Sequence, residues 1–356
     1  MTWYGVRLDT EDMVVVGQGP EVGFLTEGLP YVPGSTLRGA LAGLWIREAG
    51  RYPGDLEPAE RRSFERLFEG DVRFGPCHVV GGRLEGMSER FLKYRRADDD
   101  PAVVDLALED EPPHPGYEGG KGGVRNAPMA TVTRTAIDPD TGMARASHLF
   151  SVRGLAPRTQ LAGWIVGEHD WLDRLAERGP VRLRVGARRS IAGSVILRVE
   201  AQSAPPVDIA ATRPHVVVRL TSPAIFVDDA TRPVIGFPVA DLARAAGLAA
   251  DQITVARQYV RPLRVHGWHA AAGLPKPDEL AVAQGSTAVL TLATDRREAA
   301  LTSLLQQGLG LRRNEGFGFV DLVTTCEELP PRDAAPRASD GQDPVEPWLG
   351  KLEDSG

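Results

Sequence analysis

The chain has 356 residues, of which 42% are hydrophobic and 25% charged, so its composition is that of a globular protein with room for two cores. No apolar run is long enough to span a bilayer, and residues 1–10 are strand-like rather than leader-like, so we expect a cytoplasmic protein with no membrane partner. Cys77 and Cys326 are far apart and outside any CxxC motif, which excludes a disulfide framework and gives no indication of a zinc site.

The net charge of -7 is unevenly distributed along the chain. Residues 98–111 carry seven acids and no base, and residues 327–356 carry eight acids and three bases. The rest of the chain is therefore net positive, with arginines beside glycines. Because the local field matters more than the total charge, a nucleic-acid partner stays possible.

Residues 31–45, YVPGSTLRGALAGLW, predict an amphipathic helix with Ser35 as its N-cap. Leu37, Ala40, Leu41, Leu44 and Trp45 recur at helical spacing and form one apolar face. Free N–H groups and a nearby arginine at the helix start suit an anion. The candidate phosphate contacts there are Gly34, Ser35, Thr36 and Arg38. An ordinary capped helix with a solvated arginine explains the same residues.

Residues 90–130 are mixed in charge and rich in glycine and proline, and predict a long, irregular and mobile insertion. Residues 131–152 predict two strands around a turn at Asp138–Gly142. Asp138 and Asp140 would suit a metal or acid pair, but a turn uses the same residues and is the favoured interpretation.

The first of two turns rich in glycine and arginine follows a predicted helix at 169–178 and a strand at 181–185. It reads GARRSIAG and contains Arg188, Arg189 and Ser190. The proline-rich residues 202–214 then predict a domain boundary. We therefore expect domains at 1–203 and 213–326, followed by an acidic disordered tail at 327–356.

The second half predicts a helix at 239–249, a loop at 265–277 that contains Trp268 and Lys276, and a helix at 295–307. The stretch GLGLRRNEGFGFV at 308–320 comes next, with a strand at 317–323. Glycines allow close backbone approach, and arginines donate to phosphate, so this loop can face a polyanion. A helix C-cap followed by a hairpin turn is the plainer alternative.

The two halves share an order of strand, helix, strands, helix and arginine–glycine turn. This order predicts an α+β protein made of two ferredoxin-like (RRM-like) βαββαβ domains with insertions and glycine-rich loops.

The chain resembles the CRISPR-associated RAMP superfamily. The resemblance is carried by VPGSTLRGAL at 32–41, RTAIDPDTG at 134–142, LFSV at 149–152, GARRS at 186–190, GLPKP at 273–277 and GLGLRRNEGFG at 308–318. The last two look most like the Csx-ten subunit (Cas-five group) of type III-D effector complexes.

The resemblance implies a non-catalytic subunit, without a cofactor or metal, that caps the 5′ handle of the guide RNA (crRNA) in antiviral defence. Its partners would be the large polymerase-like subunit and the first RAMP backbone subunit. The RNA-binding residues it implies join the helix start named above with Arg188, Arg189, Ser190, Lys276, Arg312, Arg313, Asn314, Gly316 and Gly318. The first turn ends Ile-Ala-Gly-Ser, without the glycine–aromatic–glycine of the second, so its part in RNA contact is the weaker expectation.

Three other functions stay open at this point, and one of them is a protein-interaction module with no RNA of its own. A metal-independent endoribonuclease that matures guide RNA would use His148, His266 or His269 with a nearby arginine. A backbone subunit that cleaves target RNA would use Asp138 or an aspartate of the 98–100 run.

Overall fold

The computed structural model describes residues 1–17, 24–51, 53–92, 103–109, 117–120, 122–202, 215–269 and 273–325. These residues form a mixed α+β protein with more strand than helix. The expected aspartate run at 98–100, Cys326 and the acidic tail at 327–356 lie outside the described residues. The described residues up to 202 and those from 215 onward are called the first and second lobes below, and each lobe has its own buried core.

The first lobe is built on a sheet of six strands, which is antiparallel wherever its strands pair and has the order β13-β14-β1-β12-β3, with β4 also paired to β12. Its strands are β1 (Trp3–Thr10), β3 (Arg73–Phe74), β4 (His78–Val79), β12 (Gln160–Val166), β13 (Val181–Arg184) and β14 (Ser194–Gln202). Tyr4, Val6 and Leu8 alternate along β1 and are all buried in the first core. The opposite face of this sheet carries Gly5 and Arg7, and at its edge Leu305 of the second lobe packs near Trp3.

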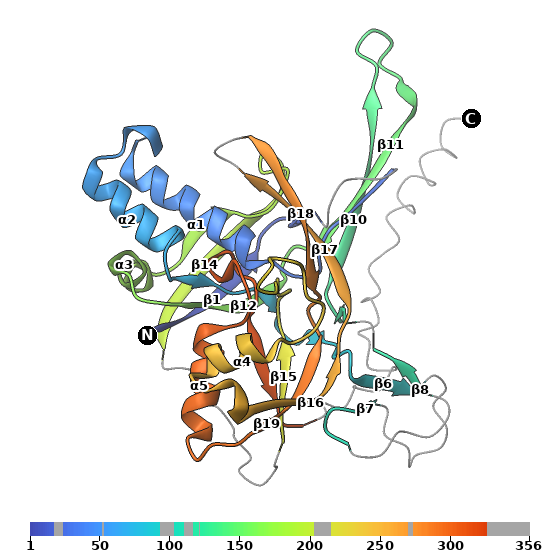
Figure 1. The fold of residues 1–356 in the computed structure, drawn as a ribbon. Helices are drawn as coiled ribbons and strands as arrows, with labels where there is room; N and C mark the ends of the chain where they lie inside the picture. The colour runs from blue at the N-terminus through green and yellow to red at the C-terminus, as the bar shows by residue number, and fades with distance from the viewer. Residues whose placement is uncertain are drawn as a thin grey trace.

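Three helices cover the buried face of that sheet (Figure 1). They are α1 (Gly34–Ala49), α2 (Pro58–Phe68) and α3 (Asp170–Arg178). The predicted apolar face of α1 is confirmed, because all five of its residues are buried. The predicted N-cap was wrong: the cap is Pro33, with no side-chain hydrogen bond, and Ser35 already lies inside the helix. Proline at this position presets an extended φ of -61°.

The second lobe has a four-stranded sheet in the order β16-β19-β15-β20. Its strands are β15 (His215–Leu220), β16 (Ile253–Tyr259), β19 (Thr287–Leu292) and β20 (Val320–Val323). Helices α4 (Val239–Ala246) and α5 (Arg297–Gln307) pack together on one face of it (Figure 1). In the first lobe β1 lies between β14 and β12, and in the second lobe β15 lies between β20 and β19. In both lobes the first strand therefore lies between the last strand and the strand that precedes the last helix.

The two arginine–glycine turns have the same backbone connections. In the first lobe the N–H of Ala187 donates to the carbonyl of Val15 at 2.7 Å. In the second lobe the N–H of Leu311 donates to the carbonyl of Ile225 at 2.9 Å. In each case the acceptor follows the first strand of the lobe. The internal duplication predicted from the sequence is thus present in the hydrogen bonds of these turns.

The arginines that follow also correspond. Arg188 and Arg312 both have left-handed backbone, with φ of 56° and 52°. Each turn then closes on a glycine, Gly193 or Gly318, whose N–H donates back to the segment after the first strand. The second turn holds one extra residue before this glycine, and Phe317 fills that position.

Short strands lie just before the expected insertion at 90–130 and in its described parts. They are β5 (Arg83–Leu84), β6 (Glu89–Leu92), β7 (Val103–Asp105), β8 (Tyr117–Gly119) and β9 (Val124–Arg125). Arg219 of β15 reaches into them, 2.7 Å from Asp105 and 3.0 Å from Glu89, and both carboxylates are buried. A buried, paired network of this kind fixes the geometry of the groups it joins.

Two long hairpins leave the body (Figure 1). The first joins β10 (Met129–Ile137) to β11 (Ala144–Leu155), with short β2 (Leu25–Glu27) paired parallel to β11. The turn predicted at Asp138 is confirmed, since its Oδ1 accepts the N–H of Asp140 at 3.0 Å. The second hairpin joins β17 (Pro262–His269) to β18 (Leu274–Val282). The loop expected at 265–277 was therefore wrong, because cross-strand pairing outweighs the low strand propensity of its glycines and prolines.

The two lobes meet where the backbones of Gly34, Gly316 and Phe74 converge. A Cβ on Gly316 would lie 2.6 Å from both the Cα of Gly34 and the carbonyl oxygen of Phe74. A Cβ on Gly34 would lie 1.8 Å from that same oxygen. Next to this contact Phe319 packs on Trp3 and Val166 of the first lobe.

Replacing either junction glycine by alanine should destabilise the protein, because no side-chain atom fits between the three backbones. We expect Gly316→Ala, which also has a φ of 93°, to lower the free energy of unfolding by about 2 kcal/mol or more. Thermal unfolding measures the change. Gly39→Ala is the matched control: this exposed α1 glycine has no heavy atom within 4 Å of an added Cβ, so the change should stabilise the helix slightly. Equal melting temperatures for Gly316→Ala and wild type would contradict the contact.

Candidate nucleic-acid interface

The start of α1 and the loop at 308–318 form one site, although they come from opposite ends of the sequence. The loop contains a turn of 3-10 helix, η3 (Arg313–Glu315), that contacts both α1 and β3. The N–H groups of Gly34 and Ser35 have no acceptor among the described residues. Ser35 is exposed, so its N–H can donate to an anionic ligand at the positive end of the helix.

Arg312 and Lys276 are held by two carboxylates rather than left open to solvent. Arg312 pairs with Glu315 at 2.7 Å and also with Glu279, and its guanidinium lies 4.8 Å from the centre of the Phe317 ring. Lys276 of β18 donates to the same Glu315 at 2.8 Å. The charges of these two predicted RNA-binding side chains are thus already compensated, and their contacts fasten the loop to the β17–β18 hairpin.

Arg313 and Asn314 are the half-buried polar residues of the loop that remain available. Arg313 donates from Nη1 to the carbonyl of Gln307 at 3.1 Å and forms no ion pair in the described part of the chain. Nearby Arg73 is buried and donates to the carbonyl of Leu305. Burial, together with the charge of Arg313, lowers the pKa of Arg73 to about 9. Two uncompensated guanidinium groups this close make the junction attractive to an anion.

Arg38 does not point to the helix start as we expected. Its Nε donates to the carbonyl of Phe68 at 2.7 Å and its Nη2 pairs with Glu69. Arg38 therefore satisfies the last turn of α2, where a cation is favourable. Gly316 and Gly318 are buried, and they serve the close approach of backbones instead of offering a surface.

The first turn presents its predicted residues on the first lobe. Arg188 lies 5.5 Å above the ring of Phe150 on β11, while Arg189 donates to the carbonyl of Gly186 at 3.1 Å. Arg189 and Ser190 are exposed. This turn lies beside the base of the β10–β11 hairpin, so a chain that contacted both turns would pass over that base.

Of the three histidines considered for an endoribonuclease, the structure describes the side chain of His266 alone. His266 pairs with Asp278 at 2.6 Å. It lies at a bulge of β17, where the pairing with β18 shifts between Val265 and Gly267. The side chains of His148 and His269 are not among those described. No group of three or more His, Cys, Asp or Glu side chains in the described ranges is placed to hold a metal ion.

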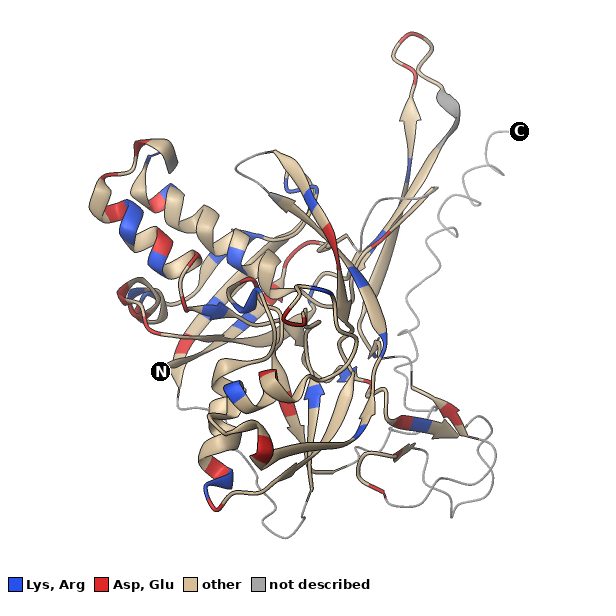
Figure 2. Ribbon diagram, in the orientation of Figure 1, with Lys and Arg blue, Asp and Glu red and all other residues tan. Residues whose placement is uncertain are grey.

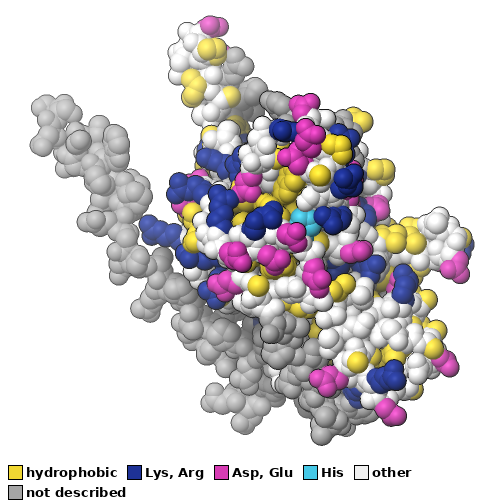
Figure 3. All heavy atoms as spheres, turned by 90° about the vertical axis from the view of Figure 1, so that its left-hand side faces the viewer, with side chains coloured by type: hydrophobic (Ala, Val, Ile, Leu, Met, Phe, Trp, Pro, Cys, Tyr) yellow, Lys and Arg dark blue, Asp and Glu magenta, His cyan; other side chains and the backbone are white. Residues whose placement is uncertain are grey.

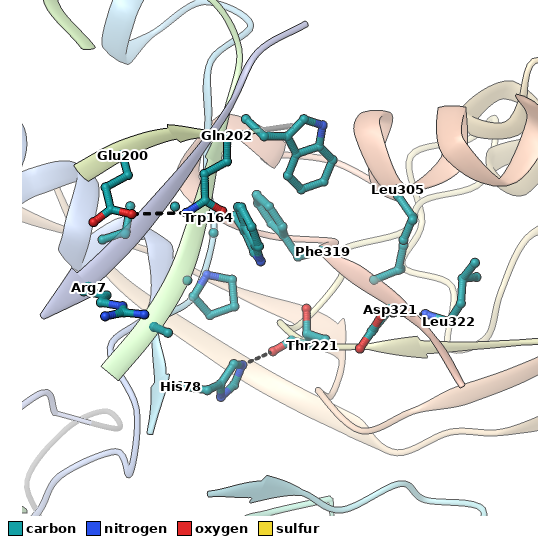
Figure 4. A pocket seen from close by; sticks show the side chains of 18 of the residues that line it. Arg7, His78, Trp164, Glu200, Gln202, Thr221, Leu305, Phe319, Asp321 and Leu322 are labelled. Carbon is teal, nitrogen blue, oxygen red and sulfur yellow. Dashed lines mark hydrogen bonds between the residues drawn. The ribbon is translucent and has the colours of Figure 1, made fainter. Parts of the chain in front are cut away.

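Sequence reasoning missed a pocket of about 550 Å³ between the open face of the first sheet and the second lobe (Figure 4). Arg7, Trp164 and Glu200 line its first-lobe side, and Thr221 and Phe319 its second-lobe side. His78 also lines it, with Nε2 3.0 Å from the carbonyl oxygen of Thr221. Burial lowers the pKa of His78, so the ring is neutral near pH 7 and donates to that carbonyl. Alternation on each strand was visible in the sequence, but the register that joins the strands was not.

Basic and acidic residues are mixed over the surface. Figure 2 shows both along α2 and along the β17–β18 hairpin. Figure 3 shows dark blue and magenta side chains close together on the face that includes the helices of the first lobe. The face in Figure 3 therefore presents no single broad basic surface, and an anion contact there would depend on particular groups.

Family comparisons assign the chain at the superfamily level. The model described as the RAMP superfamily matches residues 7–191. This chain belongs to the RAMP superfamily. The model described as CRISPR-associated protein (Cas_Cmr3) matches residues 133–323 of this RAMP protein, which include the loop at 308–318. No curated protein matches the sequence.

Solved structures resemble this RAMP protein only distantly. A chain in the type III-B Cmr-beta structure bound to cognate target RNA is 13% identical over 87% of this chain and 99% of that chain, with a TM-score of 0.46. A chain in the type III-B Cmr-beta structure bound to cognate target RNA and AMPPnP is 16% identical over 80% of this chain and 86% of that chain, with a TM-score of 0.44. A Cas6-related protein from Pyrococcus furiosus is 10% identical over 90% of this chain and 98% of that chain, with a TM-score of 0.40. All three TM-scores are below 0.5, so no conclusion rests on them. None of the helices in the described part of the chain is long and apolar enough to cross a membrane.

The pairing of Glu315 makes stability depend on pH. Burial alone would raise its pKa, but hydrogen bonds from Arg312 and Lys276 lower it to about 2. The stabilisation is therefore complete above the unfolded pKa of about 4.3 and is lost as the pH falls toward 2. We expect Glu315→Gln to cost on the order of 1–2 kcal/mol at pH 7, and the difference from wild type to vanish near pH 2. Urea unfolding at several pH values measures this difference. Exposed Glu177→Gln should show none; a difference for Glu315→Gln that does not change with pH would refute the pairing.

Proposed function

We propose that this chain is a non-catalytic RNA-binding subunit of a type III CRISPR effector complex. It caps the 5′ handle of the guide RNA and docks the large polymerase-like subunit and the first backbone subunit. The single observation that carries the proposal is the convergence of the α1 start with the loop at 308–318 in a protein of the RAMP superfamily. The match to the CRISPR-associated Cas_Cmr3 model over the half that holds this loop supports it.

The junction suits the phosphate backbone of a single RNA strand. Ser35 offers an exposed main-chain N–H, Arg313 a charged planar donor, and Asn314 an amide that can reach a base edge or a sugar. Arg312 and Lys276 contribute indirectly, because their pairs with Glu315 hold the RNA-binding loop in place. Arg189 and Ser190 of the first turn extend the same contact surface.

The finer assignments belong to the same proposal. The strand orders β14-β1-β12-β3 and β16-β19-β15-β20 each fit a ferredoxin-like βαββαβ unit, so we infer two such domains near 1–203 and 213–326. The RRNEGFG and GLPKP segments support the type III-D, Csx-ten assignment. The cell compartment follows from the function, since guide RNA is cytoplasmic.

Removing Arg313 should weaken guide-RNA retention. In the assembled complex we expect Arg313→Ala to lower retention several-fold at 150 mM salt, and to reduce the slope of log K against log salt by about 0.7 because one phosphate contact is lost. Retention is measured by filter binding with labelled guide RNA. Arg232→Ala, which removes an exposed second-lobe arginine paired with Asp228, is the matched control. Wild-type retention by Arg313→Ala would count against the junction as the RNA site.

The endoribonuclease alternative gives a separate test. Incubating the purified chain with repeat RNA in chelator should give no site-specific cutting, because the described histidines are not placed beside a free cation at the junction. Gel electrophoresis of end-labelled RNA reads the result. Cutting that His266→Ala abolishes would favour the enzyme instead. Target cleavage by the complex should likewise survive Asp138→Ala, since this carboxylate caps its own turn.

A further inference from the structure

The open face of the first sheet carries an arrangement that the junction does not use. Gly5 lies in the middle of β1, directly opposite Trp164 on one side and Glu200 on the other. Because paired residues of antiparallel strands project to the same face, the glycine leaves a shallow floor between an indole and a carboxylate. The flexible amide of Gln202 covers this floor, 2.9 Å from where a Cβ of residue 5 would lie, and donates to Glu200 at 3.4 Å. Figure 4 shows these side chains around the pocket, with Phe319 and Thr221 of the second lobe facing them.

One pair further along, Arg7 is directly opposite Arg198. Like charges at this position in a sheet are unfavourable unless an anion lies between them. Arg198 is 50% exposed and its Nε is 3.7 Å from Asp9, a weak pairing at the surface. Arg7 is exposed and has no hydrogen bond or ion pair to another described residue. The two guanidinium groups are therefore available to one ligand.

The pocket has a suitable size and shape for a planar group. Its volume of about 550 Å³ is within the range of small-ligand sites. Trp164 is half-buried and held edge-on by Trp3, with ring centres 5.6 Å apart at 84°. This contact fixes the indole without stacking on it. The floor, the indole, the carboxylate and the paired arginines then match the four parts of a nucleotide site: space, stacking surface, base-edge acceptor and phosphate clamp.

We propose that this pocket binds one unstacked nucleotide of a single RNA strand. The base takes the place of the Gln202 amide over Gly5 and stacks on Trp164, its amino group donates to Glu200, and its phosphate lies between Arg7 and Arg198. The inference rests on the proposed RNA-binding function and adds a second contact on the other side of β3 from the junction. Phe74 of β3 touches the junction, and Gly75, the next residue, lines the pocket. An acidic or aromatic protein segment is less well suited, because Glu200 would repel the first and the arginine pair would remain unmatched by the second.

The test measures binding of the full chain to an eight-nucleotide single-stranded RNA, the matching RNA duplex and free nucleoside 5′-monophosphates. We expect the single strand to bind at least tenfold more tightly than the duplex, and the free nucleotides to bind weakly at the same site. Trp164→Leu should weaken single-strand binding by about 5- to 100-fold, since stacking on one aromatic ring supplies on the order of 1–3 kcal/mol. Trp164→Phe should restore most of it. Trp268→Leu, at a tryptophan that is 63% exposed on β17, should change it less than twofold.

Two further variants keep the test independent of folding effects at Trp164. Gly5→Val fills the floor with a residue that favours strands, and the nearest atom to its Cβ is the flexible end of Gln202 at 2.9 Å. It should weaken binding as much as Trp164→Leu without lowering the melting temperature. Arg7→Gln should reduce the salt slope by about 0.7. RNA carrying 5-iodouridine should crosslink to the peptide that contains Trp164.

The outcomes separate this site from the junction. No single-strand binding at 150 mM salt, equal binding of strand and duplex, or equal loss with Trp164→Leu and Trp268→Leu overturns the pocket proposal. Loss with Trp164→Leu and Gly5→Val, combined with full guide-RNA retention by Arg313→Ala, keeps the pocket and rejects the capping role. Unchanged single-strand binding by Trp164→Leu and Gly5→Val, combined with loss of guide-RNA retention by Arg313→Ala, keeps the junction and rejects the pocket.

Discussion

The contact of three backbones at Gly34, Gly316 and Phe74 is the constraint on which the arrangement of the lobes depends. A side chain at either glycine would overlap main-chain atoms that cannot move without displacing α1 or β3. Phe317 and Phe319 flank the contact and pack in different directions, one on the β17–β18 hairpin and one on the first lobe. The alternation of glycine and phenylalanine thus binds three parts of the fold at one point. Any ligand at the α1 start is held by both lobes together.

Electrostatics at this point follow from pairing more than from composition. Two of the four cations in and beside the loop are matched by Glu315 and Glu279. Their main contribution is to fix a loop whose Arg312 has an unfavourable left-handed backbone. The charge that remains, on Arg313 and on buried Arg73, is small in number but poorly screened by solvent. This local excess explains how a chain with a net charge of -7 can present an anion site.

Much of the local structure could be predicted from the sequence, because it depends on spacing within one element. The buried face of α1 and the turn at Asp138 are of this kind. The hairpin at 262–282 was missed because its strands are stabilised by pairing with each other, which propensity does not reveal. The partners of Arg38, Arg312 and Lys276 were missed for a related reason: a carboxylate that neutralises an arginine is found only in three dimensions.

The duplicated turns show how one backbone arrangement can serve two purposes. Both turns hold an arginine in left-handed backbone and close on a glycine that donates back to its own lobe. In the first turn the residue before that glycine is Ala192, and the turn stays at the surface of its lobe. In the second, Gly316 and the inserted Phe317 let the loop reach a neighbouring backbone and the β17–β18 hairpin. One residue of extra length and the loss of one Cβ therefore convert a surface turn into the joint between the lobes. That joint brings a helix start from one lobe to an arginine of the other, and neither half alone would provide this pair.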